Sequence, residues 1–105
     1  MRNKIVLAIS SLFFIANVQA FDTTGLGKIV STQGHEVPAC RTVKFKDNQT
    51  GTEKNYRING GDGGSDIMSV TLSALIANRD VTISYEPGVT SGCGPENRIL
   101  FVTVF

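Results

Sequence analysis

Few residues in this chain could carry out covalent or acid–base chemistry. His35 is the only histidine, and it lies in a turn-like stretch beside Glu36. No serine stands in a motif that would place it beside a histidine base, as nucleophilic catalysis requires. One histidine and two widely separated cysteines also make a poor metal site. The sequence therefore predicts no catalytic residue, no metal and no cofactor, and a protein that works by binding.

The two cysteines are expected to form a disulfide. Cys40 and Cys93 are the only cysteines in the chain, so they can pair in one way only. On the chain-entropy model, a bond that closes the loop over 40–93 stabilises the fold by about 4 kcal/mol. That contribution is large for a small domain, whose core is marginal without such help. A structural disulfide also indicates an oxidising compartment.

The first twenty residues have the three-part layout of a secretory signal peptide. Arg2 and Lys4 give a positive start, an apolar run covers 5–16, and Val18 and Ala20 are the small residues that a signal peptidase reads. The run is short for a membrane span. We expect residues 1–20 to be removed, which leaves one domain over 21–105, without a membrane span, that is secreted through the periplasm.

The charged residues give no sign of a nucleic-acid partner. Arg2 and Lys4 account for two of the ten basic residues, so 21–105 carries eight basic residues against nine acidic ones. The two signs are mixed along the chain, and no basic run stands out. A nucleic-acid or anionic-membrane partner is therefore not expected.

Alternating apolar and polar residues predict several short strands. Over 41–46, Val43 and Phe45 share one face, and over 53–58, Tyr56 and Ile58 do the same. Turn residues over 47–51 join these two strands into a hairpin. Further strands are expected over 27–31, 80–85 and 98–105, with a turn at Pro87. The last strand is apolar on both sides, so we expect both of its faces to be covered.

A single helix is predicted over 66–78, after a glycine-rich loop. Ser65 or Asp66 is placed to cap its start. An apolar stripe at helical spacing faces the core, and its members are Met68, Leu72, Leu75 and Ile76, widened by Val70, Ala74 and Ala77. The other face carries hydroxyls and amides but no charge between Asp66 and Arg79. Such a face is unusual in open water and indicates contact with neighbouring subunits.

The order of these elements favours a small barrel. Three strands, one helix and two strands in fewer than ninety residues indicate a mainly β, OB-fold-like Greek-key barrel. An open α+β sheet with the helix on one face is the alternative.

One segment resembles a known family. Residues 81–89 read Val-Thr-Ile-Ser-Tyr-Glu-Pro-Gly-Val and follow an apolar helix. Gly-Lys-Ile-Val-Ser-Thr-Gln over 27–33 and Pro-Ala-Cys over 38–40 stand upstream in the same order. In these features the chain resembles the B subunits of the pentameric bacterial toxins, those of subtilase cytotoxin and typhoid toxin.

The resemblance implies a function and a set of residues. It implies a non-enzymatic subunit that forms a homopentamer, binds host-cell glycans ending in sialic acid, and delivers an A subunit. Tyr85 matches a tyrosine at the family's sugar pocket. Leu26 stands where the family has a serine, with Thr23 and Thr24 close by. The helices would surround a central pore, with the oligomer contacts expected from Met68, Thr71, Leu72 and Leu75.

Two other functions fit the residues themselves. A small, disulfide-linked β domain suits an exported protein-binding module such as an enzyme inhibitor. It also suits a structural component of a surface assembly. The oligomeric state separates the toxin subunit from the binding module, since five copies are expected for the first and one or two for the second.

Overall fold

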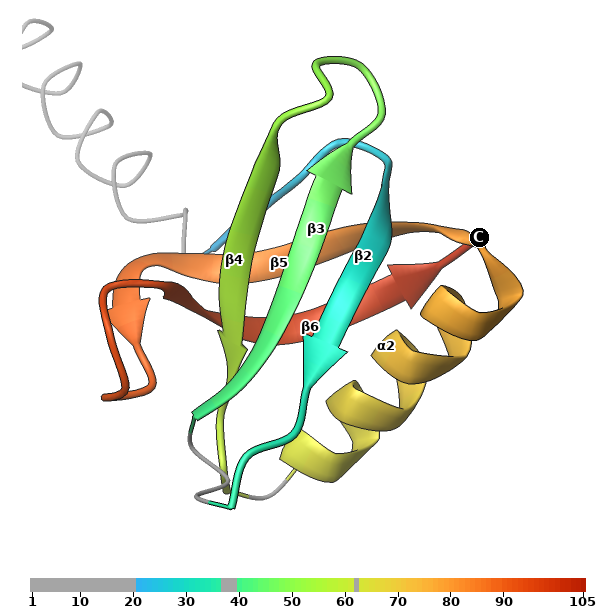
Figure 1. Ribbon diagram of the computed structural model, residues 1–105. Coiled ribbons are helices and arrows are strands. Elements are labelled where there is room, and N and C mark those ends of the chain that lie inside the picture. Colours follow the sequence, from blue (N-terminus) through green and yellow to red (C-terminus); the bar gives the residue numbers. More distant parts are fainter. Residues whose placement is uncertain (1–20, 37–39, 62) are drawn as a thin grey trace, which may run out of the picture.

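The computed structural model describes residues 21–36, 40–61 and 63–105, and these form a closed barrel with one helix (Figure 1). The expected signal peptide over 1–20 lies outside the described residues. The elements are β1 (Asp22–Thr23), β2 (Gly27–Gln33), β3 (Arg41–Asp47), β4 (Glu53–Ile58), α2 (Gly64–Ala77), β5 (Asp80–Thr90) and β6 (Asn97–Val104).

Five of the strands close on themselves. The order is β5-β2-β3-β4-β6, and β6 pairs with β5 again, while the short strand β1 lies beside β5. Neighbours are antiparallel except for β4 and β6, which are parallel at Arg57 and Arg98. With the helix between the third and fourth barrel strands, this is the OB-fold arrangement that the element order predicts. Because β6 pairs with β5 and closes the sheet, the alternative prediction of an open α+β sheet is wrong.

The core fills the barrel with the residues that strand alternation selects. Val43 and Phe45 of β3 and Tyr56 and Ile58 of β4 are buried, as the sequence predicts. The remaining core residues come from the other strands and the helix: Ile29, Ala74, Val81, Ile83 and Ile99. The alternation of apolar and polar residues therefore predicts correctly which side chains of β3 and β4 point into the barrel.

The helix differs from its prediction in its start and in its buried face. It begins at Gly64, and Gly63 takes the N-cap position with φ 86° and no side-chain hydrogen bond, so neither Ser65 nor Asp66 caps it. Its fully buried residues are Gly64, Thr71 and Ala74, with Ile67, Met68 and Leu75 packed partly against the core. Leu72 and Ile76, which the apolar stripe places inside, are 45% and 76% exposed.

Close packing explains why small residues face the barrel. Figure 1 shows α2 lying along the lower end of the barrel beside β2 and β6. At Gly64 the first turn lies so close to the loop that follows β4 that a Cβ atom would lie 2.1 Å from the carbonyl oxygen of Asn59. Thr71 can be buried because its hydroxyl donates to the carbonyl of Ile67. Leucine and isoleucine on this contact line would hold the helix away from the strands.

The last two strands also differ from their predictions, because both contain irregular pairing. β5 continues through Pro87 to Thr90, and the register shifts between Tyr85 and Thr90, so the proline lies in a bulged region and not in a turn. In β6 the partner of Ser84 is Phe101 and that of Tyr85 is Ile99, which leaves Leu100 as an extra residue. Such a bulge reverses the faces of the residues beyond it.

As a result, the outer side of β6 is only partly covered by the described residues, with the Phe21 ring 5.7 Å from that of Phe101. Ile99 is buried and Val102 packs partly against the core. Phe101 is 46% exposed and Phe105 is 54% exposed. The prediction that both faces of this strand are covered is therefore wrong for the single chain.

Candidate functional site

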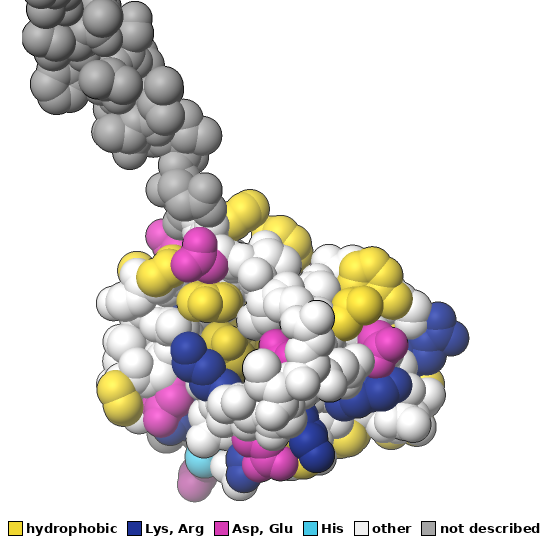
Figure 2. Space-filling view, turned by 90° about the horizontal axis from the view of Figure 1, so that it is seen from above, with side chains coloured by type: hydrophobic (Ala, Val, Ile, Leu, Met, Phe, Trp, Pro, Cys, Tyr) yellow, Lys and Arg dark blue, Asp and Glu magenta, His cyan; other side chains and the backbone are white. Residues whose placement is uncertain are grey.

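A pocket of about 200 Å³ lies at the barrel mouth, between the segment that follows β1 and the β3–β4 turn. We call it the mouth pocket. Its lining residues are Thr24, Gly25, Phe45, Asp47, Thr50, Thr52, Lys54 and Tyr56. Figure 2 looks onto the end of the molecule that carries this turn, and shows hydrophobic surface set among polar and charged side chains.

Two aromatic rings contribute the apolar part of the mouth pocket. Phe45 and Tyr56 are both inward-facing core residues, and their ring centroids are 6.4 Å apart in an edge-to-face arrangement. Because these residues lie where the barrel opens, their rings close the core and also line the pocket. The apolar surface of the site is thus an extension of the core.

Lys54 reaches the pocket because of its position in the strand. It lies directly opposite Phe45 in the β3–β4 ladder, and opposed residues of antiparallel strands project to the same side. At the end of the barrel this side is open to solvent, so the charged group remains hydrated. The Lys54 Nζ atom lies 5.9 Å from the ring centroids of both Tyr56 and Tyr85, within the range of a cation–π contact.

The β3–β4 turn holds the threonine hydroxyls at the rim. The Asp47 Oδ1 atom accepts hydrogen bonds from the backbone N–H groups of Gln49, at 2.8 Å, and Thr50, at 3.1 Å. Gly51 has φ 73°, a conformation that glycine adopts without steric cost. The Thr50 hydroxyl donates to that of Thr52 at 3.0 Å. A rigid turn therefore presents two adjacent hydroxyls to the pocket.

Tyr85 and Thr24, two of the residues expected at the sugar site, both lie at this end of the barrel. The Tyr85 ring is half-buried and lies 5.2 Å from the Tyr56 ring, next to the pocket. Thr24 lines the pocket, and its hydroxyl oxygen accepts from the backbone N–H of Ile83 at 3.0 Å and donates to the carbonyl of Gly25 at 2.8 Å.

Thr23 and Leu26 lie near the mouth pocket but do not line it. The Thr23 hydroxyl is hydrogen-bonded at 2.9 Å to that of Ser84, which is buried. Leu26 is 48% exposed and lines a neighbouring hollow of about 300 Å³, which shares Gly25 and Asp47 with the mouth pocket. The Leu26 side chain has no hydrogen-bonding group, so it cannot replace a serine as a donor or an acceptor.

Sequence reasoning missed most of the mouth pocket. Phe45 and Tyr56 were assigned to the core, and Lys54, Asp47 and the turn threonines were not singled out. One signal was available: Lys54 and Tyr56 are two residues apart in a strand and must share a face. Nothing in the sequence indicated that the segment around Thr24 lies next to the β3 and β4 residues of the pocket.

Burial changes the acidity of one pocket residue. Removal from water, together with the nearby Tyr85 and Asp47, raises the pKa of Tyr56 to about 12. Tyr56 is therefore a neutral hydrogen-bonding group at physiological pH. In the described part of the chain, no cluster of three or more His, Cys, Asp or Glu side chains could hold a metal ion.

The four helix residues expected at an oligomer contact lie in different environments. Thr71 is fully buried against its own barrel, and Met68 and Leu75 are half-buried there. Leu72 alone points outward. Packing against the barrel uses the first three. The exposed residues of α2 are Ser65, Asp66, Ser69, Val70, Leu72, Ser73, Ile76 and Ala77.

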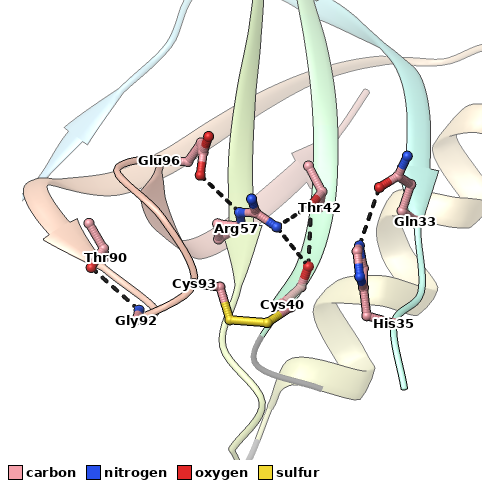
Figure 3. Close-up of a disulfide and its surroundings, with 9 residues drawn as sticks. All are labelled: Gln33, His35, Cys40, Thr42, Arg57, Thr90, Gly92, Cys93 and Glu96. Carbon is pink, nitrogen blue, oxygen red and sulfur yellow. Dashed lines mark hydrogen bonds and ion pairs between the residues drawn. A yellow bond between two sulfur atoms is a disulfide. The ribbon is translucent and has the colours of Figure 1, made fainter. Parts of the chain in front are cut away.

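The Cys40–Cys93 disulfide is present, as predicted. It joins the residue before β3 to the loop before β6, at the opposite end of β3 from the mouth pocket (Figures 1 and 3).

Within the described residues, no helix is long and apolar enough to cross a membrane. No protein-family model, curated protein or solved structure matches this chain.

Proposed function

We propose that the chain is a non-enzymatic, glycan-binding B subunit of a secreted bacterial toxin. The observation that carries this proposal is the composition of the mouth pocket, where aromatic rings, threonine hydroxyls and one lysine meet. Sugar rings present C–H surfaces that pack on aromatic side chains, and hydroxyls that hydrogen-bond to polar ones. Lys54 adds a positive charge, which suits the carboxylate of a terminal sialic acid.

Assembly into a homopentamer would give such a site useful strength. A small, open pocket binds one sugar weakly, and repetition of the site on a ring raises the overall affinity through avidity. The outward face of α2 has no charge between Asp66 and Arg79, and its Leu72 and Ile76 side chains are exposed. We propose this face as the contact between subunits, in place of the residues that pack inward.

The remaining parts of the proposal rest on the sequence. The leader-like residues 1–20 direct the chain through the periplasm to the exterior, and the disulfide suits that oxidising route. The resemblance to toxin B subunits supplies the A subunit that the ring would deliver.

Calorimetry with 3′-sialyllactose and lactose tests the site directly. We expect the wild-type protein to bind 3′-sialyllactose more tightly than lactose, because only the former carries a carboxylate for Lys54. Lys54→Gln should weaken sialyllactose binding about tenfold, the size of a lost charge-assisted hydrogen bond. Tyr85→Phe should also weaken binding, and unchanged binding would remove the Tyr85 hydroxyl from the site.

Lys46→Gln is the matched control for the site. Lys46 is an exposed lysine of β3 that is not among the pocket residues, and its substitution should leave the affinity unchanged. Equal binding of sialyllactose and lactose, or equal losses in the two lysine variants, would contradict the proposed site.

A second function is favoured by the exposed side chains of α2. Leu72 and Ile76 could contact a different protein, as in a small exported enzyme inhibitor. A protein that remains monomeric at high concentration, and binds no sialylated glycan, would support this alternative.

A further inference from the structure

A second depression lies on the outside of the barrel and differs from the mouth pocket in its chemistry. It has a volume of about 250 Å³ and crosses β2, β3 and β4. We call it the strand groove. Its walls are polar and contain no carboxylate and no aromatic side chain apart from the ring of His35.

Strand pairing builds the strand groove in two rows. Ser31, Lys44 and Asn55 are direct partners across the three strands and form the first row. Gln33, Thr42 and Arg57 form the second row in the same way. A bulge at Val30 adjusts the register so that the β2 residues align with both rows. Six hydrogen-bonding side chains thus lie side by side on one outer face.

The second row is held in a fixed geometry near the disulfide (Figure 3). The Arg57 Nη1 atom donates to the carbonyl of Cys40 at 2.8 Å and to the Thr42 hydroxyl at 2.6 Å, and its Nε atom donates to Glu96 at 3.0 Å. These bonds connect β4 to both sides of the Cys40–Cys93 bridge. The strand groove is therefore an ordered surface in the unliganded protein.

Lys44 is the charged group available to a ligand. Glu96 already balances the charge of Arg57, whereas Lys44 has no ion-pair or hydrogen-bond partner in the described part of the chain. Its side chain is nevertheless half-buried among the hydroxyls and amides of the groove. An ammonium group in this position, surrounded by polar side chains, favours an anionic group on a ligand with many hydroxyls.

We propose that the strand groove binds an acidic saccharide, through a sulfate or carboxylate group at Lys44 and sugar hydroxyls at the neighbouring amides and hydroxyls. In OB-folds, the face formed by the second and third barrel strands binds oligonucleotides or oligosaccharides. A nucleic acid would need stacking platforms and a strongly basic groove, and this groove has neither. The inference concerns a separate site and does not depend on the proposed function of the mouth pocket.

Titration with three tetrasaccharides tests the inference: chondroitin sulfate, unsulfated chondroitin and maltotetraose. The wild-type protein should bind the two acidic probes and not the neutral one, and the preferred probe identifies the anionic group as sulfate or carboxylate. Lys44→Gln should weaken acidic-probe binding about tenfold. Lys46→Gln, a matched change at an exposed lysine of β3 that lines neither the strand groove nor the mouth pocket, should leave this binding unchanged.

Four outcomes would overturn the proposal. They are no binding of either acidic probe, equal binding of the neutral probe, unchanged affinity in Lys44→Gln, and tighter binding of a single-stranded oligonucleotide than of the acidic probes. Loss of probe binding in Lys54→Gln alone would assign the acidic saccharide to the mouth pocket and would also reject the strand groove. The sialyllactose measurement on Lys44→Gln keeps the two sites distinguishable, because the mouth pocket should be unaffected.

Discussion

At the scale of single residues, the same side chains serve the core and the surface. Tyr56 is buried among core residues, yet its ring lines the mouth pocket and contacts both Tyr85 and Lys54. A small barrel has little interior, so residues near its open end must meet solvent as well as the core. The binding chemistry proposed for this end therefore depends on residues that also stabilise the fold.

The raised pKa of Tyr56 gives a direct test of its burial. The chain has two tyrosines, and absorbance at 295 nm reports their ionisation. We expect one ionisation step near pH 12 in the wild-type protein, which Tyr56→Phe removes. Because the folded pKa lies above the usual value, the neutral form stabilises the fold below pH 10 and this contribution is lost as the pH rises toward 12. The absence of a step near pH 12 would contradict the burial of the Tyr56 hydroxyl.

Glu96 has the opposite pH dependence. Its hydrogen bond to Arg57 lowers the pKa of the Glu96 carboxyl below its usual range. The folded state thus favours the ionised form, so the ion pair contributes stability above the usual carboxyl range, and this contribution is lost as the pH falls through the lowered pKa. We expect Glu96→Gln to lose less stability than the wild type between pH 6 and pH 3, by roughly 0.5 kcal/mol. Urea unfolding at both pH values measures this difference, and parallel losses would show that the pair is uncoupled from folding.

At the scale of elements, the position of α2 is set by the residues at its contact with the barrel. Gly64 allows the first turn to lie against the carbonyl of Asn59 in the loop that follows β4, and Thr71 and Ala74 are buried against the barrel. The larger apolar residues Leu72 and Ile76 consequently face away from the barrel. Tight packing on small residues thus creates the exposed apolar surface proposed as a subunit contact.

Substitution of Gly64 tests this packing. A Cβ atom at this position would overlap the Asn59 carbonyl oxygen at 2.1 Å, and the backbone would have to move. We expect Gly64→Ala to destabilise the fold by about 1–3 kcal/mol, as overpacking does. Gly34→Ala is a control, because no atom lies within 4 Å of a Cβ atom there. Thermal denaturation compares the two variants, and equal melting temperatures would show that the first turn of α2 is not held against the preceding loop as closely as described.

Charge on the outward face of α2 tests the proposed assembly. Sedimentation equilibrium of the wild-type chain should give a mass near five protomers. Ile76→Lys should yield a smaller species, because burial of an unpaired charge in a contact is costly, while the fold is retained since Ile76 is 76% exposed. Lys46→Gln, on β3, should leave the mass unchanged. A wild-type monomer at high concentration would reject the ring.

At the scale of the whole molecule, one covalent bond links distant parts of the barrel. The Cys40–Cys93 disulfide spans a sequence separation of 53 residues and joins the start of β3 to the loop before β6. The ion pair between Arg57 and Glu96 connects the same regions through β4. This end of the barrel is thus held by covalent and polar links, whereas the mouth pocket at the other end is open.

Removal of the disulfide should reveal how much this small domain depends on it. The Cys40→Ser, Cys93→Ser double variant is expected to lose about 4 kcal/mol on the chain-entropy model. For a domain of this size, such a loss lowers Tm by more than 10 °C. Thermal unfolding of the oxidised protein, the reduced protein and the double variant measures this effect. Reduced and double-variant proteins as stable as the oxidised wild type would show that the noncovalent core is sufficient.

The sequence by itself determined the inner faces of two strands and the covalent link. Alternation selected the inner faces of β3 and β4 because a strand has a strict period of two, and two cysteines allow one pairing only. The order of strands and helix favoured the barrel and left the open α+β sheet as the alternative. These features depend on neighbouring residues or on simple counting.

Only the tertiary structure decided which faces meet and where the pockets form. The buried side of α2 depends on how closely the barrel approaches, and a single bulge at Leu100 changes the outward side of β6. The mouth pocket and the strand groove each join segments that are far apart in the chain. Hydrophobic periodicity does not predict how closely two elements approach, because close packing depends on the shapes of the two surfaces that meet.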